Sequence, residues 1–154
     1  MEFPYIKVID FPNHQKRERF LPWILFGIFN LKDESNVLYP VGLIDSGSEI
    51  TIIDHEFAEK LGIEIKSGIK NRVYGVGGGY IDIWSHKVGL SIRDGKSKEP
   101  VIYTDFVAFT YEKFPASMPQ QTAILGTIGF FRQLDVTLKY PRSIFVEPKK
   151  FSSH

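Results

Sequence analysis

The stretch VGLIDSGSEI, residues 41–50, places an acidic residue at the end of an apolar run. A short apolar run of this kind is typical of a buried strand. Asp45 stands where that strand would end, and Ser46 and Gly47 follow it directly. Serine and glycine after an aspartate also favour an ordinary turn, in which the carboxylate only caps the backbone. The stretch alone therefore leaves two interpretations open, a carboxylate held for chemistry and a simple turn residue.

The composition indicates an ordinary globular protein with a single domain. The chain has 154 residues, of which 43% are hydrophobic and 24% are charged, so it can bury one sizeable core. The net charge of +1 gives no electrostatic reason to expect a nucleic acid or an acidic membrane as partner. The absence of cysteine excludes disulfides, thiolate nucleophiles and Cys-ligated metals, and it fits a reducing compartment.

The N-terminal residues lack the basic-then-apolar order of a signal peptide. The most apolar stretch, residues 20–31, is too short to span a bilayer, and Pro22 and Gly27 interrupt it. We therefore expect a buried strand there, no membrane partner and a cytoplasmic location.

Short β-rich runs separated by turn signals predict an all-β barrel or sandwich. A short helix is expected at 54–62, where Asp54 is a plausible N-cap and Gly62 a plausible C-terminal cap. A second short helix is expected after the apolar run that begins at Ala123. The predicted strands cover residues 23–30, 37–44, 49–53, the two arms of a hairpin within 71–92, 101–109, and two strands within 136–148.

The glycine cluster GVGGGY, residues 75–80, lies between two apolar runs and predicts a hairpin with a pliant tip. A phosphate-binding loop would need a different glycine spacing and a following helix, whereas residues 81–84 alternate like a strand. The four histidines are scattered and form no metal template, so we expect no metal and no cofactor. Ser46 lacks the Gly-x-Ser-x-Gly setting of a serine hydrolase.

Three features occur in order: the Asp-Ser-Gly triplet after an apolar run, the glycine-rich hairpin about thirty residues later, and Ile-Leu-Gly at 124–126. In this order the sequence resembles the retropepsin-like aspartic proteases, the single-domain relatives of pepsin that include retroviral proteases. The resemblance spans approximately residues 21–148. It implies a closed all-β barrel with a flap hairpin and one or two short helices. The implied division is an N-terminal extension (1–20), the protease domain (21–148) and a C-terminal tail (149–154).

The resemblance also implies roles for individual residues. Asp45 matches the catalytic aspartate, and Ser46 and Gly47 match the loop that holds it. The positions that would contact substrate are Ser48 and Glu49 after the triplet, Val76, Gly77, Gly78, Gly79 and Tyr80 on the flap, and Ile124 in a pocket wall. Two departures concern substrate choice and dimer contacts: Ile128 replaces a polar residue common in the family, and Glu49 replaces a commoner aspartate.

Peptide hydrolysis by this chemistry needs two carboxylates close together, one charged to activate water and one protonated to donate to the carbonyl oxygen. The chain contains a single Asp-Ser-Gly triplet and so supplies one such carboxylate. The resemblance therefore implies a homodimeric aspartic endopeptidase, with an Asp45/Asp45' dyad on the two-fold axis and a peptide or unfolded protein as substrate. The alternatives are a non-catalytic peptide- or protein-binding module on the same fold, and a structural β protein.

Overall fold

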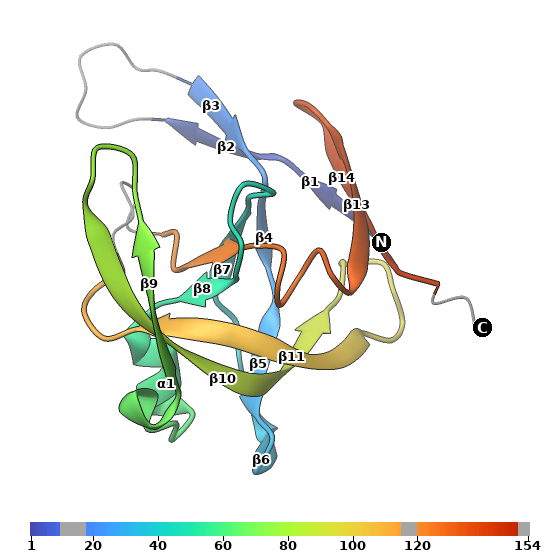
Figure 1. Cartoon of the computed structure of the whole chain (residues 1–154). Coiled ribbons are helices and arrows are strands. Elements are labelled where there is room, and N and C mark those ends of the chain that lie inside the picture. The colour runs from blue at the N-terminus through green and yellow to red at the C-terminus, as the bar shows by residue number, and fades with distance from the viewer. Residues whose placement is uncertain (10–17, 115–119, 151–154) are drawn as a thin grey trace.

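The computed structural model describes residues 1–9, 18–114 and 120–150. Within these ranges the chain is mostly β, with one short α-helix and one 3-10 turn (Figure 1). The elements are β1 (Glu2–Pro4), β2 (Ile6–Ile9), β3 (Glu18–Leu21), β4 (Trp23–Leu25), β5 (Gly27–Asn30), β6 (Asp33–Leu38), β7 (Val41–Ile44), β8 (Ile52–Ile53), α1 (His55–Lys60), η1 (Ile65–Ser67), β9 (Ile69–Tyr74), β10 (Tyr80–Ile92), β11 (Val101–Thr110), β12 (Ala123–Leu125), β13 (Leu134–Lys139) and β14 (Ser143–Pro148).

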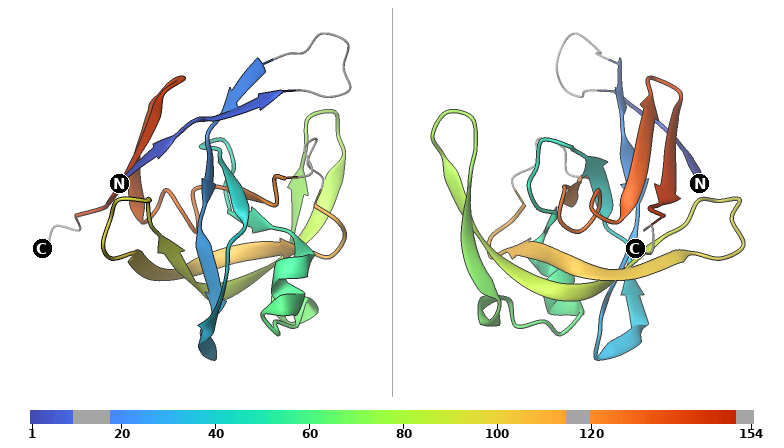
Figure 2. Two further views of the ribbon diagram at one scale, coloured as in Figure 1. Left: turned by 180° about the vertical axis from the view of Figure 1, so that it is seen from behind. Right: turned by 45° about the vertical axis from the view of Figure 1, so that its right-hand side comes forward.

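One sheet of nine strands carries most of the fold. Its strands follow the order β4-β7-β12-β8-β11-β10-β5-β6, and β9 pairs with β10 outside this path. Figures 1 and 2 show the sheet strongly curled into a half-barrel, with α1 against one end. Because successive side chains point to opposite faces of a strand, the curl gathers one apolar face into a common core. Fully buried members of this core include Phe26, Ile28, Val88, Leu90, Phe109 and Leu125.

The predicted hairpin between residues 23–30 and 37–44 is confirmed, but each arm is divided. β4 pairs with β7, whereas β5 pairs with β6 and β10. The first arm changes neighbours at Phe26, which is 1% exposed and whose backbone N–H donates to Pro40 O over 3.3 Å. Gly27 follows because an added β-carbon would collide with Ser91 Oγ on β10. The division places β7, with Asp45 directly after it, between β4 and β12 in the sheet.

The first predicted helix is confirmed as α1. The side chain of Asp54 accepts a hydrogen bond from Glu56 N over 2.9 Å, as an N-cap does, and Gly62 has a φ of 68° just beyond the helix. The second predicted helix is wrong, because residues 127–133 form turns. There Arg132 N donates to Thr127 O over 2.9 Å, and Gly129 has a φ of 93°, which a right-handed helix cannot contain.

The two ends of the described chain meet in a second sheet of order β1-β14-β13. Phe3 and Ile144 pair across it and are both buried. Asp94, in the turn before β11, attaches β1 to the main body by accepting from Glu2 N over 2.8 Å. Hydrogen bonds from Ser97 and from the Glu2 backbone hold the pKa of Asp94 well below its usual range.

This lowered pKa predicts acid sensitivity. A carboxyl group with a lowered folded-state pKa contributes stability above its unfolded value of about 3.9, and this contribution is lost as pH falls toward the folded value. We expect the melting temperature to decrease as the pH is lowered below about 4. Asp94→Asn should lower the melting temperature at neutral pH and make its dependence on pH in the acidic range (the acid limb) less steep. Differential scanning calorimetry between neutral and acidic pH measures both; an unchanged acid limb in the variant would contradict the assignment.

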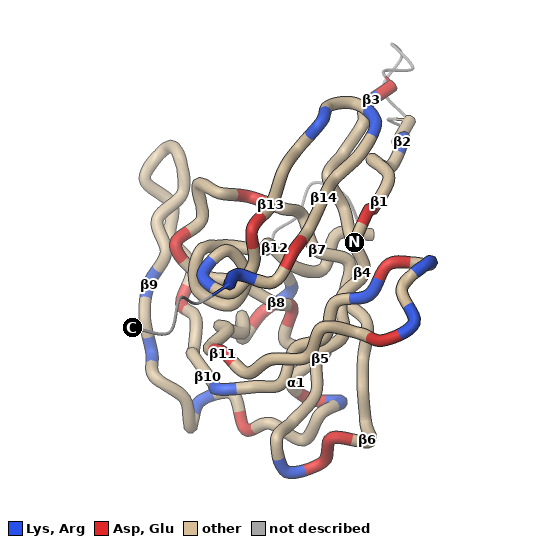
Figure 3. Tube along the Cα trace, turned by 90° about the vertical axis from the view of Figure 1, so that its right-hand side faces the viewer, with Lys and Arg blue, Asp and Glu red and all other residues tan. Residues whose placement is uncertain are grey.

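β2 and β3 form a separate two-stranded sheet that projects from the body (Figures 1 and 2). Tyr140, in the turn between β13 and β14, packs edge-on against Tyr5 and Phe20 at its base, with ring centroids 5.6 and 6.4 Å apart. Acidic and basic residues are interspersed along the described trace (Figure 3). Among the described residues, no helix is long and apolar enough to cross a membrane.

Candidate active site

Asp45 follows β7 directly and begins a tight turn. Its carboxylate accepts a hydrogen bond from Gly47 N over 2.9 Å, and its backbone oxygen accepts from Ser48 N over 3.2 Å. A β-carbon at Gly47 would lie 3.2 Å from Asp45 Oδ1, tighter than most such contacts, so glycine leaves the carboxylate room. Asp45 is half-buried, while Ser46 and Gly47 are exposed. The turn thus presents an oriented carboxylate at the surface of the chain.

The run AILG lies beside this turn because β12 pairs in parallel with β7. Ile124 is opposite Leu43 and Leu125 is opposite Ile44. The pairing continues past the strand ends, where Asp45 N donates to Leu125 O over 3.0 Å. Two sequence-predicted features, more than seventy residues apart, are therefore adjacent in the sheet.

Gly126 passes under the loop that contains Asp45. An added β-carbon there would lie 2.7 Å from Ser48 O and from the carbonyl carbon and oxygen of Ile50, all backbone atoms. Gly126 N donates to the hydroxyl of Thr51, which is fully buried, over 3.1 Å. Glycine at this position is thus required by a close approach of two backbones.

Ser48 and Glu49 continue the loop. Their carbonyl oxygens accept hydrogen bonds of 2.9 Å from Thr127 N and Ile128 N. The Ser48 hydroxyl donates to Ile50 O over 2.8 Å, and Glu49 is exposed. The backbone of both residues is therefore held from the 126–129 segment, while the Glu49 side chain points into solvent.

The glycine cluster forms the tip of the predicted hairpin, between β9 and β10. Gly75 N donates to Gly79 O over 2.8 Å, and Gly77 and Gly78 have φ values of 95° and 86°. Val76 at the tip is fully exposed. Residues other than glycine rarely adopt such angles, so this tip conformation depends on the two glycines.

In the hairpin, the antiparallel pairing of β9 with β10 places Arg72 opposite Asp82 and Tyr74 opposite Tyr80. Arg72 Nε lies 3.1 Å from Asp82 Oδ1, and its guanidinium carbon lies 3.7 Å from the centre of the Tyr80 ring. The hydrogen bond from Arg72 keeps the pKa of Asp82 below its usual range. These cross-strand contacts stiffen the hairpin below its pliant tip.

An apolar cluster joins the hairpin base to the loop after Asp45. Its buried members are Ile52, Ile83, Ala108 and Phe114; Ile50, Val73, Ile81 and Ile124 pack against them and remain half-buried. Ile50 and Ile124 come from beside Asp45, and Val73 and Ile81 come from the hairpin. The predicted flap, pocket-wall and catalytic segments are thus parts of one packed region.

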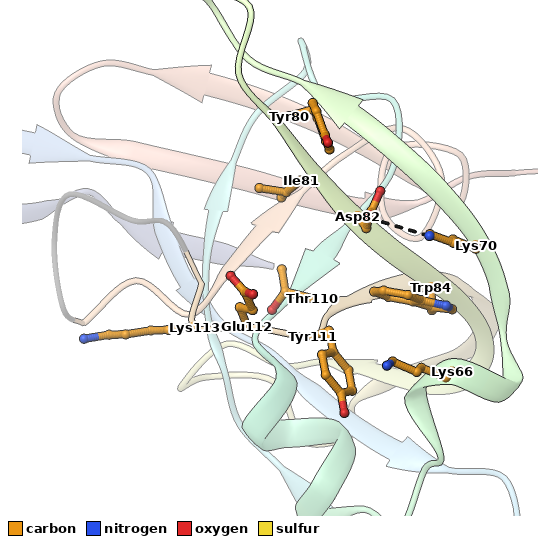
Figure 4. Close-up of a pocket in the computed structure, with 10 residues that line it drawn as sticks. All are labelled: Lys66, Lys70, Tyr80, Ile81, Asp82, Trp84, Thr110, Tyr111, Glu112 and Lys113. Atoms are coloured by element: carbon orange, nitrogen blue, oxygen red, sulfur yellow. Dashed lines mark ion pairs between the residues drawn. The ribbon is translucent and has the colours of Figure 1, made fainter.

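A cavity of about 500 Å³ lies between the hairpin and residues 110–113 (Figure 4). Lys66 Nζ lies 4.1 Å from the centre of the Tyr111 ring and Lys70 Nζ lies 5.7 Å from that of Trp84, while Asp82 and Glu112 add opposite charge. Among the sequence-predicted site residues, Tyr80 lines this cavity, whereas the loop 45–49 does not.

The sequence patterns missed the most heavily hydrogen-bonded carboxylate near the site. Asp105, on β11, is 2% exposed and contacts Arg132 and Gln133. The available signal was an acid within the mostly apolar strand 101–109, where nothing in the sequence indicated its partner. Among the described residues, no cluster of three His, Asp or Glu side chains could hold a metal ion.

Comparison with solved structures identifies the fold class. The crystal structure of a retropepsin-like aspartic protease from Rickettsia conorii matches with a TM-score of 0.51 and 14% identity over 95% of this chain and 93% of that one. The EIAV protease complexed with the inhibitor HBY-793 also matches, with a TM-score of 0.37 and 17% identity over 75% of this chain and 86% of that one. No protein-family model and no curated protein matches the sequence.

The chain therefore has the retropepsin-like fold, as the order of its three motifs predicted. At this identity the match defines the fold, and fold alone does not establish catalysis.

Proposed function

We propose that this protein is an aspartic endopeptidase whose active site forms between two copies of the chain. The observation that carries the proposal is the setting of Asp45: a half-buried carboxylate after β7, held by Gly47 N–H at 2.9 Å, in a chain of retropepsin-like fold. The proposed peptidase domain covers residues 21–148, flanked by residues 1–20 and 149–154, and we propose a cytoplasmic location.

The chemistry requires a second carboxylate at hydrogen-bonding distance. Two carboxylates so close cannot both ionise easily, so the pair keeps one proton between them. The charged member accepts a proton from the attacking water, and the protonated member donates to the oxygen of the scissile carbonyl. One water molecule is the only added reactant in this hydrolysis of the peptide bond, so the proposed reaction needs no cofactor.

The second carboxylate is proposed to come from Asp45 of an identical subunit. Asp45 is the one aspartate of the sequence in an Asp-Ser-Gly triplet, and its loop lies at an accessible surface of the chain. A two-fold axis beside this loop places the same group of both subunits in one site. The substrate would lie extended across both loops, hydrogen-bonded to the backbone near Ser48 and Glu49 and covered by residues Val76 to Tyr80 of each hairpin.

The test is cleavage of an unfolded protein by the purified chain, with products identified by mass spectrometry. Activity per subunit should rise with protein concentration through the range in which sedimentation velocity shows dimers, and a statine-type transition-state mimic should block it. Full activity from a strictly monomeric sample would overturn the proposal. Peptide binding without products at any pH would assign the fold to a binding module instead.

The flap offers a further prediction. Gly78→Ala places a β-carbon at a φ of 86°, which costs an L residue about 1–2 kcal/mol and shifts the tip away from its present conformation. We expect kcat/KM to fall about tenfold because closure over the substrate is impaired. Peptide-cleavage kinetics measure the loss.

Gly62→Ala is the matched control for this change. Gly62 also has a positive φ, 68°, and open space around it, but it lies after α1 and away from the flap. It should lose similar stability without the loss of activity. Equal activity in the two variants would show that the tip conformation does not matter for turnover.

A further inference from the structure

Asp105 is a buried carboxylate for which the proposed chemistry has no use. It lies in β11 and is 2% exposed. Burial alone would raise the pKa of Asp105, but hydrogen bonds from Arg132, Gln133 and Phe106 N outweigh it and keep the group ionised. Keeping a charge buried costs desolvation free energy, so the contacts that Asp105 makes indicate its role.

The contacts of Asp105 converge on one short segment. Oδ2 accepts from Gly129 N over 3.2 Å, from Arg132 Nε over 3.2 Å and from Gln133 Nε2 over 3.1 Å. Oδ1 accepts from Arg132 Nη2 and, over 2.8 Å, from Phe106 N on its own strand. Apart from the Phe106 bond, every one of these donors belongs to residues 129–133, so the carboxylate ties that segment to β11.

Residues 126–128 directly precede 129–133, and this whole 126–133 segment holds the loop that follows Asp45. Thr127 N and Ile128 N donate to Ser48 O and Glu49 O, both over 2.9 Å, and Thr51 N donates to Ile128 O over 2.8 Å. The path from the Asp105 carboxylate to the backbone of Ser48 and Glu49 is therefore short and made of hydrogen bonds and peptide units.

Close packing leaves this segment little freedom to move independently. A β-carbon on Gly126 would lie 2.7 Å from Ser48 O on one side, and one on Gly129 would lie 2.8 Å from Phe106 O on the other. The segment is thus clamped between the 48–51 loop and β11. A displacement at Gly129 is transmitted to the loop because the intervening space is filled.

We propose that Asp105 is a positioning residue that fixes the backbone of Ser48 and Glu49 for substrate alignment through the 126–133 segment. The part that concerns substrate rests on the proposed peptidase function. Asp45 itself is held separately, by Leu125 O and Gly47 N–H. Loss of the Asp105 contacts therefore acts on the alignment of the peptide more than on the carboxylate that activates water.

Asp105→Asn tests the proposal, because it keeps the shape and removes the charge that Arg132 requires. Losing a buried, charge-assisted hydrogen bond changes the equilibrium constant for local opening of the segment by roughly tenfold or more. We expect amide hydrogen exchange at Thr127 and Ile128 to accelerate about tenfold. In peptide cleavage, KM should rise about five- to tenfold while kcat changes less than about threefold, as for lost ground-state alignment.

The matched control is Asp94→Asn. Asp94 is also buried, at 7% exposure, and accepts backbone N–H bonds from Glu2, Lys96 and Ser97, but it lies in the turn before β11 and serves β1. It should lower stability and leave both the exchange at Ile128 and KM unchanged. If the two variants act alike on exchange and on KM, Asp105 is merely structural and the proposal fails.

The two readouts separate this inference from the proposed function. If the wild-type chain cleaves nothing, the peptidase assignment falls, and the exchange rates of Thr127 and Ile128 still decide whether Asp105 positions the loop. If cleavage is normal and exchange is unchanged in Asp105→Asn, the inference falls and the peptidase assignment stands. Should Asp105→Asn not fold, Gln133→Ala removes one donor at 3.1 Å and must produce a smaller acceleration at the same amides.

Discussion

Replacing Asp45 by asparagine should lower kcat/KM for peptide cleavage by about a thousandfold or more, with the fold intact. General acid and general base steps each contribute about a hundredfold or more, and in the proposed dyad the Asp45 pair performs both. Asparagine has the same shape and can still accept from Gly47 N, so the turn after β7 remains in place. Cleavage kinetics and a circular dichroism spectrum of the same sample measure the two parts of this prediction.

Subunit mixing makes the prediction specific to a shared site. In a random equal mixture of wild-type and Asp45→Asn subunits, about a quarter of the dimers contain two wild-type chains. Activity should therefore fall to about a quarter of the value for unmixed wild-type chains at the same total concentration, whereas independent sites would retain about a half. Asp135→Asn, a change at an exposed acid on β13, provides the control and should leave activity within about twofold.

The fold could be predicted because its decisive signals are local. Each of the three motifs indicates a short backbone feature. The apolar run before Asp45 indicates the end of a strand, the glycines at 75–79 a turn with positive φ, and the run AILG a close approach of two backbones. Residue type limits such features strongly, as the φ values of Gly77 and Gly78 and the crowding at Gly126 illustrate. Their order along the chain then selects one arrangement among the all-β folds.

The errors arose where tertiary contacts override local preference. Arg132 and Gln133 are good helix formers, yet the chain turns at Gly129, and the segment bonds to Ser48 O and Glu49 O on one side and to Asp105 on the other. The division of the first hairpin at Phe26 has the same origin, since β4 and β5 have different neighbours in the sheet. A window of local sequence contains neither set of partners.

Asp105 illustrates the limit for the candidate site. Its partner Arg132 lies 27 residues away, across a loop, and nothing in the intervening sequence links the two. Within residues 101–109, the two-residue alternation of a strand places Asp105 on the same face as Tyr103 and Val107. An acid on that apolar face indicates a buried carboxylate, which is 2% exposed in the structure, but it does not indicate which residue pairs with it. Sequence spacing located the loop of Asp45, while the groups that hold this loop required three-dimensional contacts.

Phe130→Ala should produce the largest loss of stability at the site, about 3–5 kcal/mol in the free energy of unfolding. Phe130 is fully buried in the main core, and its ring meets Phe131 edge-on with centroids 5.3 Å apart. Removing it leaves a cavity beneath the 126–133 segment, which has no long helix or strand of its own to bridge the gap.

Phe131→Ala is the matched control, since Phe131 is half-buried and packs at the edge of the same core. Urea denaturation at neutral pH gives both values, and equal slopes of the free energy of unfolding with urea concentration show that the variants differ in stability and not in the surface exposed on unfolding. Phe130→Ala should cost at least twice as much as Phe131→Ala, and the exchange of Thr127 and Ile128 should rise with it, because the segment that holds the Ser48 and Glu49 backbone rests on this ring. A smaller cost for Phe130 than for Phe131 would mean that the segment does not rest on the Phe130 ring and is anchored by its hydrogen bonds to Asp105, Ser48 and Glu49.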